Sequence, residues 1–183
     1  MIRAYRAEDE AAVRTVVSEA FGEEGATVAT LADDLRATHG RAELVAEVDG
    51  AIIGHVLLSR SWVDARPTLV EVLVLSPLSV APNHQGRGVG TELVGAAVEE
   101  ARRLGVPALF LEGSPAYYSG RGFEPATLRG FTRPSTRVPE PAFQAVLLPA
   151  HEPWMTGALV YCEPFWELDC VGLRDPLLAQ LGG

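Results

Sequence analysis

The chain has 183 residues, 48% of them hydrophobic, and its formal net charge at pH 7 is −9. This length suits one globular domain with its own core. The acidity argues against general affinity for nucleic acid or for an anionic membrane surface, and it suits a cytoplasmic protein. All fifteen basic residues are arginine, so the N-terminus is the only amine that the chain could acylate on itself.

The first ten residues, the lack of a long apolar run and the two cysteines argue against several protein classes. Residues Met1–Glu10 contain no apolar stretch and reach acidic residues at once, unlike a signal peptide. No run of about 18 apolar residues occurs that could span a membrane. Cys162 and Cys170 are too few and too late in the chain for a disulfide framework or a zinc site. We therefore expect ordinary thiols and no bound metal.

The first third of the chain predicts a strand, two helices and an antiparallel hairpin. Thr27 is a good N-cap for the second helix, and Gly40 ends it. Asp49 and Gly50 are a strong two-residue turn signal between two β-rich runs. The expected elements are strands at Ile2–Arg6, Ala42–Val48 and Ala51–Trp62, and helices at Glu8–Phe21 and Thr27–His39.

The longest β-like run is Leu69–Val80, which is mostly apolar on both faces and is therefore expected to be a central strand. Pro77 has no amide proton to donate to a neighbouring strand, which predicts a bulge or a local parting from that strand. A glycine-rich turn follows, then an amphipathic helix with an apolar stripe from Leu93 to Leu104, and then a buried strand at Ala108–Leu111. This order predicts two parallel strands joined by a right-handed crossover.

The last third of the chain has weaker signals. We expect a short helix at Ser114–Ser119, a long irregular surface loop at Thr127–Pro141, late strands at Phe143–Leu148 and Gly157–Tyr161, and a weak helix at Pro176–Leu181. The tail beyond Cys162 is hard to place and is expected to pack on the domain or on a partner.

The glycine turn indicates an anion-binding site, because glycines let a ligand approach the main chain and a helix N-terminus follows at once. A dinucleotide fingerprint needs Gly-x-Gly-x-x-Gly after an early strand, whereas the spacing here is Gly-x-Gly-x-Gly. A P-loop needs a lysine, which the chain lacks. The segment Gln85–Gly90 instead resembles the Gln/Arg-x-x-Gly-x-Gly/Ala signature of the GNAT acetyltransferase superfamily, preceded by the Val-x-Pro entry at Val80–Pro82.

Other features agree with this resemblance. The order of elements over residues 2 to 161 is similar to that of GNAT proteins, and Tyr118 stands four residues before a Gly-Phe pair, as in the family. The segment from Gly113 to Tyr118 and the late pair Val160-Tyr161 resemble the YhbS-like bacterial branch. The resemblance implies an α/β (α+β mixed sheet) GNAT fold, with helices flanking a central mixed sheet and a splayed parallel strand pair. We expect a catalytic domain over residues 1–165 and a C-terminal extension over 166–183.

The family resemblance implies acetyl-CoA as cosubstrate, without a metal. Backbone amides of the turn can cradle its pyrophosphate, with a side-chain contact from Arg87 or Gln85. The parting at Pro77 would expose main chain that can pair with the pantetheine amides, and by resemblance the Val80 region would donate an amide to the thioester oxygen. The expected acetyl-CoA contacts are Leu78, Ser79, Val80, Gln85, Gly86, Arg87, Gly88, Val89, Gly90 and Thr91.

Tyr118 is the candidate acid that would protonate the CoA thiolate, since a phenol titrates near 10 as a model compound. Its alternative role is that of an amphipathic residue closing the core. Glu71 and Glu112 are candidate bases for the acceptor amine, although a carboxylate facing solvent or an arginine explains Glu71 equally well. A lone strand histidine such as His55 is more often structural than catalytic, and His84 is expected to be exposed.

These patterns predict an N-acetyltransferase that moves an acetyl group from acetyl-CoA to a primary amine of a small molecule or peptide by direct attack. The alternatives are a catalytically idle acyl-CoA-binding sensor or interaction module and a protein that binds another phosphate ligand. The arginines between Arg129 and Arg137 suggest an acceptor with an acidic part, but a solvated loop explains them as well. Family habit alone favours a homodimer.

Overall fold

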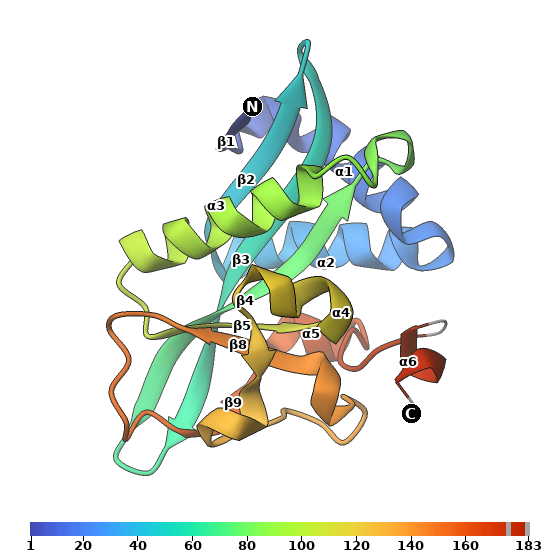
Figure 1. Ribbon diagram of the computed structural model, residues 1–183. Coiled ribbons are helices and arrows are strands. Elements are labelled where there is room, and N and C mark those ends of the chain that lie inside the picture. Colours follow the sequence, from blue (N-terminus) through green and yellow to red (C-terminus); the bar gives the residue numbers. More distant parts are fainter. Residues whose placement is uncertain (175–176, 182–183) are drawn as a thin grey trace. The chain divides into compact units, whose positions relative to one another are not determined.

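The computed structural model describes residues 1–174 and 177–181. These residues form two compact units. Unit 1 comprises Met1–Ser59 and Leu75–Glu100, and unit 2 comprises Arg60–Val74 and the chain from Ala101 onward. Two long strands and one helix therefore contribute residues to both units. The elements of each unit are described in turn below (Figure 1).

Unit 1 contains the predicted strand, helices and hairpin. The structure differs from the sequence prediction at the start of the second helix, which begins at Gly25 rather than after a cap at Thr27. A Cβ on Gly25 would lie only 2.8 Å from Ser18 Cα, so close contact between the two helices fixes this earlier start. The elements are β1 (Ile2–Ala4), α1 (Glu10–Phe21), α2 (Gly25–Thr38), β2 (Gly40–Val48) and β3 (Ala51–Ala65).

The predicted hairpin is confirmed, and it makes β2 and β3 antiparallel neighbours in the sheet of unit 1. Asp49 and Gly50 have φ angles of 51° and 80°, as a two-residue turn with both central residues left-handed requires. Strand β2 pairs antiparallel with both β1 and β3. Helices α1 and α2 pack on one face of this sheet, in a cluster that includes Val13, Ala29 and Val45.

Strand β4 (Leu69–Val80) has the predicted bounds, and α3 (Val89–Arg103) follows the glycine turn. Gly54 of β3 faces α3, because a Cβ there would lie 2.9 Å from Leu93 Cδ1. Helix α3 therefore covers the face of β3 opposite to α1 and α2 (Figure 1). Leu93, Val94, Ala97 and Ala101 of the predicted stripe are buried, and Leu104 lies beyond the helix end and is exposed.

Unit 2 is organised around β5 (Ala108–Glu112), which runs parallel to β4 through the pairs Leu73↔Leu109 and Val74↔Phe110. Strand β5 also pairs antiparallel with β8, and β8 with β6. This parallel pair inside a mixed sheet confirms the predicted fold class. The remaining elements are α4 (Pro115–Tyr118), β6 (Glu124–Pro125), β7 (Phe131–Thr132), β8 (Phe143–Leu147), β9 (Gly157–Val160), α5 (Glu163–Glu167) and α6 (Leu177–Gln180).

One expectation for the last third of the chain is wrong. The segment Thr127–Pro141 is not wholly irregular, because it contains β7 and the buried side chains Phe131 and Val138. Strand β9 pairs with β3 and, in parallel, with β7. These pairings are contacts between distant segments, which local composition does not encode.

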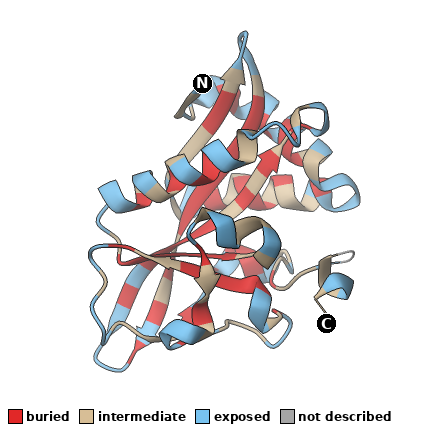
Figure 2. Cartoon of the chain, in the orientation of Figure 1, coloured by how far each residue is buried: buried red, intermediate tan, exposed pale blue. Residues whose placement is uncertain are grey.

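The tail packs into unit 2 at least as far as residue 172. Phe165 and Val171 are buried, and the amide of Gly172 donates a hydrogen bond to a Glu112 carboxylate oxygen. Helix α6 confirms part of the weak C-terminal helix, whereas Pro176 lies outside the described residues. In Figure 2 the buried residues follow the strands, and the outer side of α3 is exposed. No helix within residues 1–174 and 177–181 is both long and apolar enough to cross a membrane.

Candidate active site

The glycine turn joins a short 3-10 turn, Pro82–His84, to the start of α3. Gly86 and Gly88 have φ angles of 71° and 91°, in the region that a side chain makes unfavourable. A Cβ on either residue would meet no heavy atom within 4 Å. These two glycines are therefore required for the path of the backbone rather than for packing, and the main chain beside them is open to a ligand.

Helix α3 begins directly after this turn, because the amide of Glu92 donates to the carbonyl oxygen of Gly88 at 3.0 Å. Val89, Gly90 and Thr91 thus form the first helical turn, so the helix starts within the glycine signature rather than after it. Amides of a first turn have no acceptor within their own helix, and the positive end of the helix dipole lies there. The backbone therefore has the geometry of an anion-binding helix start.

Side chains near the turn differ in their availability to a ligand. The Nε2 atom of Gln85 donates to the carbonyl oxygen of Val80 at 3.0 Å, which ties the turn to the end of β4. Arg87 is exposed, so it is the better candidate for a phosphate contact. Leu78 is half-buried. The buried hydroxyl of Ser79 has no hydrogen-bond partner among the described residues.

Tyr118 is the last residue of α4 in unit 2. Its ring packs against Gly113, where a Cβ would lie 2.9 Å from Cδ2 and closer still to Cε2. The edge-to-face neighbours of the ring are Tyr117, at 4.8 Å between centroids, and Phe123, at 5.7 Å. Burial raises the pKa of Tyr118 above that of a free phenol, and the neighbouring Tyr117 adds to the shift. The phenol therefore stays protonated at neutral pH and can donate a hydrogen bond.

The peptide groups of Gly113 are held by Gln144 of β8 and by Ala142, which immediately precedes β8. The buried Gln144 donates from Nε2 to the carbonyl oxygen of Gly113 at 3.0 Å, and the Gly113 amide donates to Ala142 at 3.0 Å. Gln144 was missed at the sequence level. The signal that could have revealed it is a single polar side chain inside the apolar run Phe143–Leu148.

Glu112 ends β5 and is held by two neutral donors. Its Oε1 accepts from the Tyr161 hydroxyl at 2.8 Å, and its Oε2 accepts from the Gly172 amide at 3.0 Å. Burial raises the pKa of Glu112, and the two hydrogen bonds offset only part of that effect. The role of Tyr161 was also missed, because 49 residues separate it from its partner.

The other base candidate lies in a different environment. The side chain of Glu71 is 42% exposed, and its Oε2 lies 4.0 Å from Arg60 Nη1. Glu71 therefore faces solvent and an arginine, which is the non-catalytic alternative to the role of a base that the sequence also allowed. His84 is half-buried in the 3-10 turn before the glycines.

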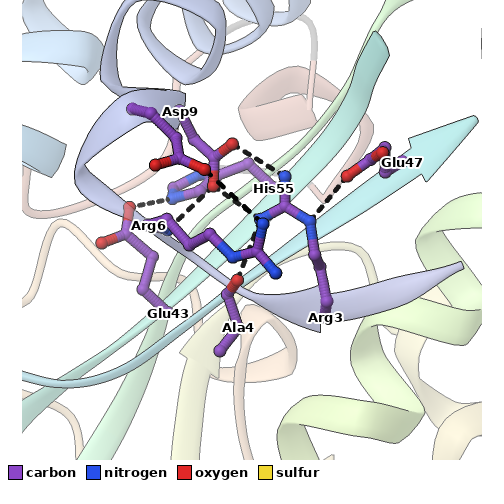
Figure 3. Close-up of polar contacts among 8 residues, drawn as sticks. Arg3, Ala4, Arg6, Asp9, Glu43, Glu47 and His55 are labelled. Atoms are coloured by element: carbon purple, nitrogen blue, oxygen red, sulfur yellow. Dashed lines mark hydrogen bonds and ion pairs between the residues drawn. The ribbon is translucent and has the colours of Figure 1, made fainter. Parts of the chain in front are cut away.

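His55 belongs to a polar cluster in unit 1 that Figure 3 shows together with the bonds of Arg3. It is fully buried, and its Nε2 lies 2.7 Å from Oε1 of Glu43. Arg36 also binds both oxygens of Glu43, at 2.7 and 2.8 Å. Arg3 forms two parallel hydrogen bonds with Asp9, which joins β1 to the start of α1. These contacts give His55 the structural role that its sequence context favours.

The arginines of the 127–141 segment bind acidic groups of the protein itself. Arg129 Nε lies 2.7 Å from Glu124, and Arg137 binds Asp169. Arg133 lies 4.0 Å from Glu140. These contacts within the protein favour a structural role for the three arginines over selection of an acidic acceptor.

Both cysteines are free thiols, Cys162 buried and Cys170 half-buried. Burial raises the pKa of Cys162 to about 11, so its thiol stays protonated and is a poor nucleophile. Among the described residues, no group of three or more His, Cys, Asp or Glu side chains is placed to hold a metal ion.

Residues 6–123 match the model of the acetyltransferase (GNAT) family. The chain belongs to this family. The uncharacterized N-acetyltransferase YjhQ of Escherichia coli K12 is 33% identical over 129 residues, which are 69% of this chain and 71% of YjhQ. The uncharacterized N-acetyltransferase YhbS of the same strain is 32% identical over 76 residues, or 42% of this chain and 44% of YhbS.

Solved structures agree with the family assignment. The crystal structure of the GNAT family N-acetyltransferase YhbS from E. coli, in complex with CoA, matches with a TM-score of 0.80 and 26% identity over 97% of this chain and 93% of that chain. A GNAT family acetyltransferase from Brucella melitensis, in complex with acetyl-CoA, matches with a TM-score of 0.73 and 28% identity over 90% and 97%. The resemblance drawn from the glycine signature is thereby confirmed.

Proposed function

We propose that this GNAT enzyme transfers an acetyl group from acetyl-CoA to a primary amine of a small molecule or peptide by direct attack. The observation that carries the proposal is the glycine turn, whose two left-handed glycines open onto the start of α3. The relatives from E. coli and B. melitensis, solved with CoA and acetyl-CoA, support the same ligand class here.

The residues present fit acetyl-CoA. The open space beside Gly86 and Gly88 and the amides of the first α3 turn suit the pyrophosphate, with Arg87 as a charged partner. The main chain of Leu78–Val80 would pair with the pantetheine amides as a further strand would. These residues would orient the thioester for attack.

The reaction needs a neutral amine, a stabilised oxyanion and a protonated leaving group. The amine nitrogen forms a bond to the thioester carbonyl carbon, and an amide from the Val80 region donates to the oxygen that becomes negative. The carbon–sulfur bond then breaks. Tyr118 donates its phenolic proton or a hydrogen bond to the departing thiolate. The high pKa of Tyr118 favours the hydrogen-bond role, because full proton transfer from a weak acid is unfavourable.

Thermal unfolding with CoA and acetyl-CoA, followed by turnover with a panel of amines, tests this function. Binding to the folded state alone raises the melting temperature, so both ligands should raise it. Acetylated amine should then form with wild-type protein. Binding without turnover across the panel would favour a sensor of acyl-CoA, and no shift with either ligand would favour another phosphate ligand.

We also propose a cytoplasmic location, a catalytic domain over residues 1–165 with an extension over 166–183, and a homodimer. The net charge of −9 and the two free thiols support the location, since thiols persist in a reducing compartment. Cell fractionation and measurement of the mass in solution test the location and the oligomeric state.

A further inference from the structure

Tyr118 can act on the leaving thiolate only while its ring is held in place, because a misplacement of about 1 Å can cost about 100-fold in rate. We propose that Gln144 is a positioning residue for Tyr118, and that it acts by fixing the peptide between Gly113 and Ser114. The inference rests on the proposed function and adds a residue to its catalytic arrangement. It is drawn from a buried hydrogen bond and from the packing of the Tyr118 ring on Gly113.

Gln144 is a buried amide in the middle of a sheet. Only 1% of the residue is exposed, and it stands opposite Leu111 of β5 and Pro125 of β6. Cross-strand partners share a face of the sheet, and so do alternate residues of one strand. Gln144, Leu111 and Gly113 therefore lie on one face, and a Cβ on Gly113 would lie 3.5 Å from Leu111 Cδ1. A buried amide is costly unless it is hydrogen-bonded, and this one donates to the Gly113 carbonyl oxygen at 3.0 Å.

This hydrogen bond lies where β5 ends and the chain turns into α4 (Figure 1). The Gly113 amide still donates to the carbonyl oxygen of Ala142 at 3.0 Å, and the Gln144 side chain provides the donor for the next carbonyl group. Ser114 is the N-cap of α4, and its carbonyl oxygen accepts from the Tyr118 amide at 3.1 Å. The orientation of the peptide that Gln144 holds thus sets the start of the helix that carries Tyr118.

The ring of Tyr118 also rests directly on this main chain. A Cβ on Gly113 would lie 2.9 Å from Cδ2 of the ring and closer still to Cε2, so ring and backbone are in close contact. Phe123 contacts the ring edge to face, with 5.7 Å between centroids. A shift of the Gly113 main chain would therefore move the ring or leave a gap beneath it. Gln144 reaches Tyr118 by two routes, the backbone of α4 and the packing of the ring.

A purely structural role for Gln144 would be to satisfy the buried carbonyl group of Gly113. Loss of the donor then lowers stability, because an unpaired buried carbonyl group is unfavourable, and a positioning role predicts that loss as well. The two roles differ in their dependence on Tyr118. A positioning residue acts through the phenol, so it has no effect on kcat once the phenol is gone, whereas general loosening of unit 2 lowers kcat in either case. A double-mutant cycle separates them.

The experiment measures steady-state kinetics of wild type, Gln144→Met, Tyr118→Phe and the double variant, with one acceptor amine that wild type acetylates. Methionine keeps the length of the side chain and lacks the amide donor. We expect Gln144→Met to lower kcat about tenfold and to leave the KM of acetyl-CoA unchanged. In the Tyr118→Phe background the same change should leave kcat unchanged. Gln180→Met, at an exposed residue of α6, is the matched control and should behave as wild type.

Gln144→Asn is the second variant, since it keeps an amide but is one methylene shorter, and the same pattern is expected. Thermal unfolding of each variant establishes a temperature at which all of them are folded. An unchanged kcat in folded Gln144→Met, or an equal loss in both backgrounds, overturns the inference. Failure of both Gln144 variants to fold assigns the residue to stability alone and overturns it as well. Lack of turnover by wild type contradicts the proposed function, and unchanged turnover by Tyr118→Phe contradicts its acid, so these failures are distinguishable.

Discussion

Glu43 in unit 1 and Glu112 in unit 2 are both largely buried carboxylates, yet their pKa values move in opposite directions. Burial favours the neutral acid in both. At Glu43, hydrogen bonds from His55 and Arg36 outweigh burial and lower the pKa below its ordinary value. At Glu112, the donors are a phenol and a backbone amide, and burial dominates.

The charge of the partner thus decides what each carboxylate can do. Glu43 remains ionised and bound to Arg36, so its contribution is to the stability of unit 1. Glu112 is held in place by two neutral donors, and burial raises the pKa of this carboxyl above its ordinary value.

The glycines of the two units differ in a similar way. Gly86 and Gly88 have positive φ angles and open space around them, whereas Gly113 has no room for a side chain beneath Tyr118. Glycine is therefore required at positions 86 and 88 by the backbone conformation, and at position 113 by the packing of the Tyr118 ring.

Among the variants that test the comparison of Glu43 with Glu112, Glu43→Gln is expected to have the largest effect. The change removes the carboxylate that both His55 and Arg36 contact and leaves Asp33 as the carboxylate partner of Arg36, and the free energy of unfolding should fall by about 3 kcal/mol. Because the pKa of Glu43 is lowered in the folded state, its stabilising contribution is present above its ordinary pKa and is lost as pH falls. Denaturant unfolding at neutral and acidic pH measures both. A Glu43→Gln protein as stable as wild type at neutral pH would show that the pair is unimportant.

Tyr118→Phe should lower kcat by about 100-fold, because the hydrogen bond to the leaving thiolate is made only as that charge develops. The ring and its packing on Gly113 remain, so the melting temperature and the Kd of acetyl-CoA should stay near the wild-type values. Steady-state kinetics and calorimetric titration test these expectations. Unchanged turnover in this variant would leave Tyr118 with its alternative role as a core residue.

A smaller effect is expected from Gly88→Ala in the turn. A side chain at a φ of 91° costs about 1–2 kcal/mol, which should weaken acetyl-CoA binding about tenfold. Gly95→Ala is the control, because Gly95 lies in α3 with open space around it. That change should raise the free energy of unfolding by up to about 1 kcal/mol and leave the Kd unchanged. Equal Kd values in both variants would remove the turn from the binding site.

The glycine turn and β4 could be predicted because their signals are local. Gly86 and Gly88 adopt the left-handed conformations that their spacing suggests, and Leu69–Val80 has the expected bounds. The environment of Glu112 could not be predicted, because it depends on Tyr161 and Gly172, 49 and 60 residues away. The pairing of β9 with β3 is another distant contact without a local signal.

The most direct test is an acetyl-transfer reaction in which free CoA, acetylated amine and the intact mass of the protein are measured together. Direct attack predicts equal amounts of CoA and acetylated amine, with an unmodified enzyme. The chain contains no lysine, so acetylation of the protein would be confined to the N-terminus or would mark a covalent intermediate. Acetyl-CoA binding without any acetylated amine, or an acetyl group retained on Cys162 or Cys170 during turnover, would contradict the proposed mechanism.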